Sequence, residues 1–137
     1  MDKIYIRNIW QDEYIVQIYI LASSEYISAN QTCYVSKDEL QNSGKMILKY
    51  INENLFNKNL YIEFGKKQGN YTPAFSIDIC HLDKLGHFNI EMDMEIDDNP
   101  ERKHRCMFFI RLDYNQVENF ANGLLLLGKN KIDEFNT

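Results

Sequence analysis

The sequence predicts an α+β domain in which one curved antiparallel sheet of about six to seven strands carries two helices on one face. Two observations support this class. Seven short segments are rich in β-branched and aromatic residues or alternate between apolar and polar residues. Two longer segments repeat apolar residues every three or four positions, and each begins with a helix-capping pattern. Because the later strands are joined by hairpin-length turns, we expect antiparallel pairing and the order βββ-α-ββββ-α.

The first half of the chain predicts three strands and a helix. The strands are expected at residues 4–6, 14–21 and 26–35. The second of these has apolar side chains on both faces, which is typical of a central strand. Ser36 and Glu39 form a capping box. The apolar stripe that follows predicts a helix through about residue 56: Leu40, Gly44, Ile47, Leu48, Ile51 and Leu55.

The second half predicts four strands and a second helix. The strands are expected at residues 60–64, 75–80, 88–98 and 106–112. Turn signals at residues 83–86 and 98–103 join the last three of them as hairpins. A second capping box is expected between Asn115 and Glu118. An apolar stripe then predicts a helix that ends near Gly128: Val117, Phe120, Ala121, Leu124 and Leu125.

Residues 87–98 carry the clearest functional signal, because apolar and acidic residues alternate along them. One face holds Phe88, Ile90, Met92, Met94 and Ile96; the other holds Glu91, Asp93, Glu95 and Asp97. Burial of the apolar row commits the four carboxylates, the acidic row, to a solvent-exposed sheet face. With a turn centred near residue 101, we expect Asp97 opposite Arg105 and Glu91 opposite Arg111.

The acidic row is therefore the predicted partner-binding surface, extended to Asp78 and Phe109 on the adjoining strands. A solvated sheet face with charge ladders is the plain alternative. The first half of the chain offers a second candidate, since large amphipathic side chains are enriched in protein contacts: Trp10, Tyr14, Tyr19, Tyr26 and Tyr34. The plainer interpretation, which the sequence favours, is that these rings fill the core with their phenols at its edge. Exposure of several of them together with the acidic row would favour an interface.

Composition limits the other functional classes. The chain has 137 residues, which suits a single domain over residues 1–137, and its net charge is −5, which disfavours nucleic acid and anionic membranes. No signal peptide or membrane-spanning segment is evident near the N-terminus, so a cytoplasmic protein is expected. The three cysteines lack metal or redox spacing. We expect no cofactor and no bound metal.

Two chemical alternatives remain open at this stage. A metal-assisted hydrolase could use Asp78, Glu91 and Asp93, and a metal could draw on His81, Asp83 and His87 around one hairpin turn. No motif with dense metal-ligand or nucleophile spacing supports either site, so the expected protein is not an enzyme. A homodimer formed through the sheet face or an edge strand is a further alternative, and both monomer and homodimer are compatible with the sequence.

The order of hydrophobic segments resembles small bacterial immunity proteins of polymorphic-toxin systems, including those that protect against wall-associated contact toxins. The resemblance spans most of the chain. It covers Trp10 before a strand, the helix at residues 36–56, the strands at 60–64 and 75–79, Asp83-x-x-Gly86-His87 and a strand, and residues 108–113 leading into Val117-x-x-Phe120-x-x-x-Leu124. The resemblance implies a non-enzymatic protein that binds a cognate protein toxin and blocks its active site. Such a toxin is often a nuclease domain with a basic cleft, which would suit an acidic partner.

Overall fold

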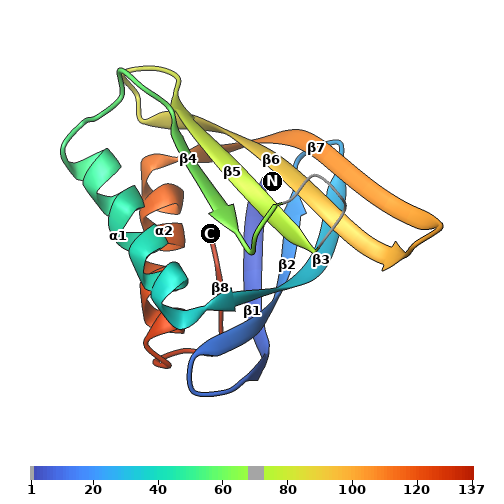
Figure 1. The fold of residues 1–137 in the computed structure, drawn as a ribbon. Helices are drawn as coiled ribbons and strands as arrows, with labels where there is room; N and C mark the ends of the chain where they lie inside the picture. The colour runs from blue at the N-terminus through green and yellow to red at the C-terminus, as the bar shows by residue number, and fades with distance from the viewer. Residues whose placement is uncertain (1, 68–72) are drawn as a thin grey trace.

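The computed structural model describes residues 2–67 and 73–137, and confirms the α+β class and the order βββ-α-ββββ-α. Within these residues the chain forms two helices and eight strands (Figure 1). The strands are β1 (Lys3–Gln11), β2 (Ile15–Ser23), β3 (Ser28–Ser36), β4 (Leu60–Phe64), β5 (Ala74–His81), β6 (His87–Asn99), β7 (Arg102–Asp113) and β8 (Glu134–Asn136). The helices are α1 (Lys37–Asn52) and α2 (Tyr114–Gly128).

The strands form two antiparallel sheets, whereas the sequence predicted one. The N-terminal sheet has the order β3-β2-β1-β8, and the C-terminal sheet has the order β4-β5-β6-β7. Helix α1 separates β3 from β4 along the chain, and β3 packs near the C-terminal sheet without joining its ladder. The sequence analysis also missed β8, a three-residue strand at the edge beside β1. Such a strand is too short for periodicity to predict it.

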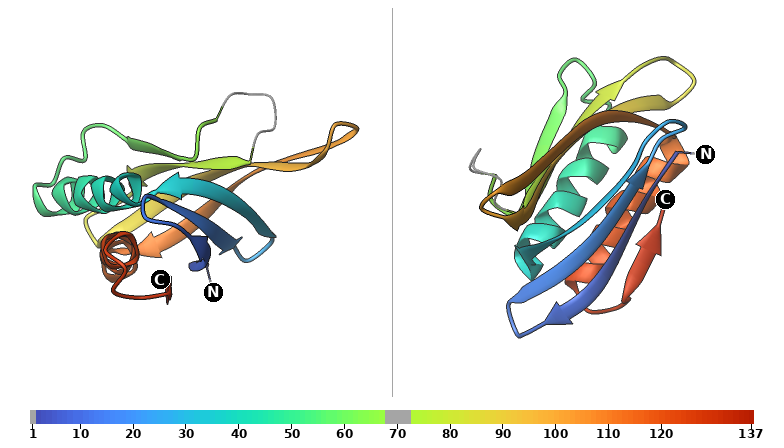
Figure 2. Two further views of the ribbon diagram at one scale, coloured as in Figure 1. Left: turned by 60° about the horizontal axis from the view of Figure 1, so that its bottom comes forward. Right: turned by 90° about the vertical axis from the view of Figure 1, so that its right-hand side faces the viewer.

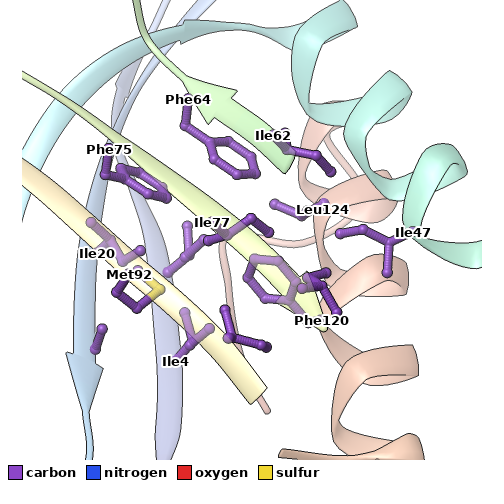
Figure 3. Packing of buried hydrophobic residues seen from close by; sticks show 14 of the residues in the cluster. Ile4, Ile20, Ile47, Ile62, Phe64, Phe75, Ile77, Met92, Phe120 and Leu124 are labelled. Atoms are coloured by element: carbon purple, nitrogen blue, oxygen red, sulfur yellow. The ribbon is translucent and has the colours of Figure 1, made fainter. Parts of the chain in front are cut away.

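The two helices lie side by side and, with the two sheets, enclose one core (Figures 1 and 2). Close approach of the helices requires Gly44, because an added Cβ there would lie 2.6 Å from the carbonyl oxygen of Ala121. Gln41 Nε2 also donates to the carbonyl of Gly128, the last residue of α2, at 3.1 Å. Side chains from all layers meet in the interior, including Ile4, Ile20, Ile77, Met92 and Phe120 (Figure 3).

One predicted capping box is confirmed, and the other begins two residues earlier than predicted. Ser36 accepts a hydrogen bond from the Glu39 amide at 2.9 Å, and Glu39 accepts one from the Ser36 amide at 3.2 Å. In α2 the cap is Asp113, whose partner is Gln116. Asp113 ends β7 in an extended conformation, so strand and helix meet directly without the linker that a cap at Asn115 would need.

The β6–β7 register differs from the predicted one by two positions. Glu91 pairs with Phe109, Glu95 with Arg105 and Asp97 with Lys103. The turn is centred between Pro100 and Glu101, which accounts for one position, and a register shift between Asp97 and Asn99 accounts for the other. Asn99 pairs with Arg102, and the extra residue at the shift restores the pairing of apolar rows with each other. Figure 2 shows that this hairpin extends beyond the rest of the molecule.

The turn between β5 and β6 forms as the sequence predicts. Asp83 Oδ1 accepts hydrogen bonds from the amides of Leu85 and His87, at 2.9 and 3.2 Å. Gly86 has a φ of 81°, in the left-handed region that suits a residue without a Cβ. This turn fixes the start of β6 and therefore which of its side chains face outward.

Candidate protein-binding surface

The outer face of the C-terminal sheet carries the predicted partner-binding residues, but two of them, Asp93 and Glu95, are buried. Asp93 is 8% exposed and Glu95 is 2% exposed, while Glu91 and Asp78 are half-buried. The predicted exposure of the acidic row is therefore wrong for Asp93 and Glu95. The Asp97 side chain lies outside the described part of the structure.

Asp93 is closed off by cations of the same chain. Lys67 Nζ lies 2.8 Å from Asp93 Oδ2 and also donates to Ser76 Oγ at 3.0 Å. Arg105 binds the same carboxylate with two donors, Nε at 3.0 Å from Oδ1 and Nη2 at 2.8 Å from Oδ2. Hydrogen bonding to Arg105, followed by Lys67, lowers the pKa of Asp93 although burial opposes this shift. The negative charge is thus neutralised internally.

Two further carboxylates of this face have buried atoms without a partner. Asp78 Oδ1 and Glu95 Oε2 are enclosed and accept no hydrogen bond from the described residues. The backbone carbonyl of Glu95, by contrast, accepts from Gln31 Nε2 at 3.1 Å, and the same nitrogen donates to Ala74 O at 3.2 Å. Gln31 on β3 of the N-terminal sheet therefore hydrogen-bonds to the backbones of β5 and β6 in the C-terminal sheet, next to Glu95.

Among the predicted site residues whose side chains the structure describes, Phe109 is the most accessible, at 53% exposed. It lies at a groove of about 560 Å³ between β7 and the β2–β3 turn, together with Tyr26 and Arg111. Asp2 crosses one end of this groove and accepts a hydrogen bond from the Arg111 amide at 2.8 Å. Phe109 is the cross-strand partner of Glu91 in the acidic row, and its other accessible surroundings are those of this groove.

The structure does not gather metal ligands. Within residues 2–67 and 73–137, no three His, Cys, Asp or Glu side chains converge as a metal site, and this includes the candidate set Asp78, Glu91 and Asp93. Around the hairpin turn, His87 Nδ1 lies 2.8 Å from Asp83 Oδ2. His81 instead stacks on Phe56, with ring centroids 4.1 Å apart. Asp83 and His87 therefore pair with each other, while His81 has a separate partner in Phe56.

The outer face of the N-terminal sheet presents a different surface, which we call the aromatic patch: Trp10, Ile15 and Tyr34. Trp10 pairs with Gln17 on β2, and Gln17 pairs with Tyr34 on β3, so both rings flank one central residue. Ile15 is two residues before Gln17 and projects from the same face. Trp10 is 50% exposed, Tyr34 58% and Ile15 40%.

A β-bulge places Trp10 on this face. The register of β1 shifts between Asn8 and Trp10, so the outward positions change from Tyr5 and Arg7 to Trp10. The Trp10 and Tyr34 rings then meet edge to face, with centroids 6.1 Å apart. Farther along the same face, the Arg7 guanidinium lies 5.3 Å from the centroid of the half-buried Tyr19 ring. A strict alternation rule applied to β1 could not place Trp10 here.

The turn that carries the patch is held by Asp12. Its Oδ1 accepts hydrogen bonds from the amides of Tyr14 and Ile15, at 2.8 and 2.7 Å. These bonds from Ile15 and Tyr14 lower the pKa of Asp12, so its carboxylate is charged at neutral pH. The carbonyl of Tyr14 also accepts from the Lys37 amide at 2.8 Å, which links this turn to the start of α1.

A groove of about 480 Å³ adjoins the aromatic patch and shares Ile15 and Tyr34 with it. It lies where β3 and β4 separate at the start of α1. Its other lining residues are Val35, Ser36, Glu39, Glu63, Gly65 and Lys66. Burial, and less strongly the nearby Glu63 carboxylate, raise the pKa of Glu39. The groove therefore combines apolar walls with two carboxylates and one ammonium group.

The aromatic surface could be partly found from the sequence, and the grooves could not. The first half of the chain is visibly rich in large aromatic residues, and four of the five that the sequence singled out are exposed: Trp10, Tyr14, Tyr26 and Tyr34. The fifth, Tyr19, is half-buried. Tyr26 lies in the β2–β3 turn, at the opposite end of β2 from the turn that precedes Ile15.

No described helix is both long and apolar enough to cross a membrane. The sequence matches no protein-family model, and no curated protein is significantly similar to it. The geometry of the two sheet faces therefore carries the functional argument.

Proposed function

We propose that this chain is a protein-binding module that neutralises a toxin domain, as the immunity proteins that it resembles do, and that the aromatic patch is its docking surface. The observation that carries the proposal is the exposure of Trp10, Ile15 and Tyr34 together on one face of a rigid sheet. Tryptophan and tyrosine are the residues most enriched among those that dominate binding energy in protein interfaces.

The patch is already ordered before a partner arrives. The Trp10 and Tyr34 rings contact each other edge to face, and the hydrogen bonds to Asp12 fix the backbone at Tyr14 and Ile15. A partner would therefore bury large apolar surfaces at a small cost in side-chain entropy. Half of the Trp10 surface remains accessible for this burial.

Charge around the patch favours a basic partner surface. Asp12, Glu13 and Asp38 are exposed near the β1–β2 turn and the start of α1, and Glu39 and Glu63 line the adjoining groove. Lys37 and Lys66 supply fewer positive charges in the same region. An acidic rim around an aromatic centre accelerates encounter with a basic protein and sets its orientation. This assigns to the N-terminal sheet the role that the sequence assigned to the acidic row.

The test is co-expression and binding with the product of an adjacent toxin-like gene. We expect protection of the host cell and a stable complex. Trp10→Ala should weaken the measured affinity about 30-fold, the effect of losing a hot spot of about 2 kcal/mol. The free energy of unfolding should fall by about 1–2 kcal/mol, because the half-buried ring also loses its contact with Tyr34.

Tyr26→Ala is the matched control, since Tyr26 is also exposed but lies at the far end of the sheet. Its affinity should stay within about two-fold of the unsubstituted protein. Equal losses for both variants, or no loss for Trp10→Ala in a complex that forms, would contradict the patch. Light scattering of the chain alone provides a separate check. A dimer that Trp10→Ala dissociates would show that the patch binds a second copy of this chain instead.

A further inference from the structure

We infer that the groove beside the aromatic patch receives an arginine side chain of the protein partner. The inference rests on the proposed function, because it names one feature of the partner that docks on the patch. The groove shares Ile15 and Tyr34 with the patch, so a protein seated on the patch would cover the groove opening as well.

The two carboxylates of the groove are fixed by contacts that leave acceptor capacity. Glu39 Oε2 accepts from the Ser36 amide at 3.2 Å, as part of the α1 capping box, and the backbone amide of Gly65 also hydrogen-bonds to the Glu39 carboxylate. Glu63 Oε1 accepts from the hydroxyl of Tyr61 at 2.9 Å. A carboxylate offers about four lone-pair sites, so each group can accept further hydrogen bonds from a ligand. Both groups are thus positioned acceptors at the groove.

The charge balance of the groove favours a cation. Two carboxylates line it against the single ammonium group of Lys66. The raised pKa of Glu39 has burial as its main cause, with Glu63 adding a repulsive contribution. Within the described lining residues, these two negative charges are therefore incompletely compensated. A positive group entering the groove would relieve their repulsion.

Arginine fits the remaining features better than lysine. Its apolar stem could lie along Ile15 and Val35, which form the apolar wall. Its planar guanidinium could stack on the exposed Tyr34 ring and bind a carboxylate through two parallel hydrogen bonds. Lysine carries a strongly hydrated point charge and lacks the planar fork, so it would gain less from the ring and from two separate acceptors.

The experiment titrates the isotope-labelled protein with N-acetyl-arginine amide and follows backbone amide signals by NMR. The neutral isostere N-acetyl-citrulline amide is the matched probe, and N-acetyl-lysine amide tests the choice of cation. We expect saturable shifts at Tyr34, Ser36 and Gly65 with the arginine probe. Citrulline should bind at least about five-fold more weakly, because it lacks the positive charge.

Glu63→Gln should weaken arginine binding at least about five-fold while keeping an acceptor for Tyr61. Glu53→Gln is the control, since Glu53 is an exposed carboxylate at the C-terminal end of α1. Amide-signal dispersion identifies any variant that fails to fold, and Glu39→Gln, which can keep the capping box, then replaces Glu63→Gln. Equal affinity for arginine and citrulline, or shifts that fall outside the groove, would overturn the inference. Tighter binding of the lysine probe would also overturn the choice of arginine.

Failure of this inference can be distinguished from failure of the proposed function. If Trp10→Ala weakens the toxin complex while Glu63→Gln changes neither the complex nor arginine binding, the patch stands and the groove assignment is wrong. If the arginine probe binds as expected but Glu63→Gln leaves the affinity of a formed toxin complex unchanged, the groove is not the contact inferred here. A parallel loss in both assays for Glu63→Gln, with none for Glu53→Gln, supports the inference.

Discussion

The outer faces of the two sheets use their polar and aromatic residues in opposite ways. On the C-terminal sheet, Asp93 of the acidic row binds two cations of its own chain, Lys67 and Arg105, and Glu95 is buried. On the N-terminal sheet, Trp10 and Tyr34 contact each other and leave half or more of their surfaces exposed. Alternation along a strand thus indicates which face a side chain occupies, but not whether that face is free to bind.

The outer faces of the two sheets differ in accessibility because different side chains cover them. Lys67 follows β4 and reaches across the C-terminal sheet to Ser76 on β5 and Asp93 on β6. No comparable described side chain covers the ring pair of Trp10 and Tyr34. Long-range coverage of this kind is set by the path of a loop. A charge pattern inside one strand cannot predict it.

The largest effect should come from removing the enclosed carboxylate. Asp93→Ala leaves the Lys67 ammonium without the carboxylate in a site where its side chain is only 10% exposed. Breaking a buried pair in this way should reduce the free energy of unfolding by about 3 kcal/mol. Denaturant melts measure the change. Asp98→Ala is the control, because Asp98 pairs with Arg102 in an exposed position, and it should cost no more than about 0.5 kcal/mol.

If Asp93→Ala were as mild as Asp98→Ala, the acidic row would be a solvated face, and the contrast between the two sheets would disappear. With so small a loss of stability for Asp93→Ala, the acidic row would again be a candidate binding surface. Binding of the toxin should fall only in proportion to the loss of folded protein. Circular dichroism and a binding titration on the folded fraction separate the two effects.

An intermediate effect is expected at the edge of the N-terminal sheet away from the patch. A Cβ on Gly123 would lie 2.2 Å from Cδ2 of Phe135, the central residue of β8. Gly123→Ala should therefore displace β8 and cost about 1–2 kcal/mol, after the helix-propensity gain of alanine. Hydrogen exchange at the Asn8 amide, which donates to Asp133 O at 2.8 Å, measures release of this segment.

Asn122→Ala, at an exposed neighbouring position of α2, is the control and should leave that exchange unchanged. Toxin affinity should survive Gly123→Ala, because β8 pairs with Tyr5, Ile6 and Arg7 and not with the patch. Lost affinity in a variant that still folds would extend the docking surface to the β8 edge.

A smaller effect should appear in the pH dependence of stability. The pKa of Asp93 is lowered in the folded state from its ordinary 3.8. The stabilisation from its charged form is therefore present above 3.8 and is lost as pH falls through the lower folded value. We expect the difference in unfolding free energy between the unsubstituted protein and Asp93→Asn to become smaller as the pH falls below 3.8. A difference that stays constant between about pH 5 and pH 2 would show that Asp93 is not linked to folding.

The elements were largely predictable from the sequence, whereas the site depended on features between elements. The capping box at Ser36, the turn at Gly86 and the inward row of β6 follow from local chemistry. The bulges near Asn8 and Asp98 do not, because each is one extra residue whose place is decided by the partner strand. One bulge moved the β6–β7 register, and the other turned Trp10 outward.

The split into two sheets was unpredictable for a related reason. The order of strands along the chain does not determine which strands pair through backbone hydrogen bonds. Here β3 contacts the C-terminal sheet through Gln31 but does not join it as a further strand. The groove with Glu39 and Glu63 forms at that separation. Its residues come from three strands, β2, β3 and β4, from the start of α1 and from the segment after β4, and no single sequence spacing links them.

The most direct test of the aromatic patch uses the single tryptophan of the chain. Labelling with 5-fluorotryptophan gives one ¹⁹F NMR signal, from Trp10, which can be followed as the toxin domain is added. If the patch is the docking surface, this signal should shift on binding and lose its sensitivity to exchange of H₂O for D₂O, because a partner has covered the ring. A complex that forms while the signal and its solvent sensitivity stay unchanged would contradict the account.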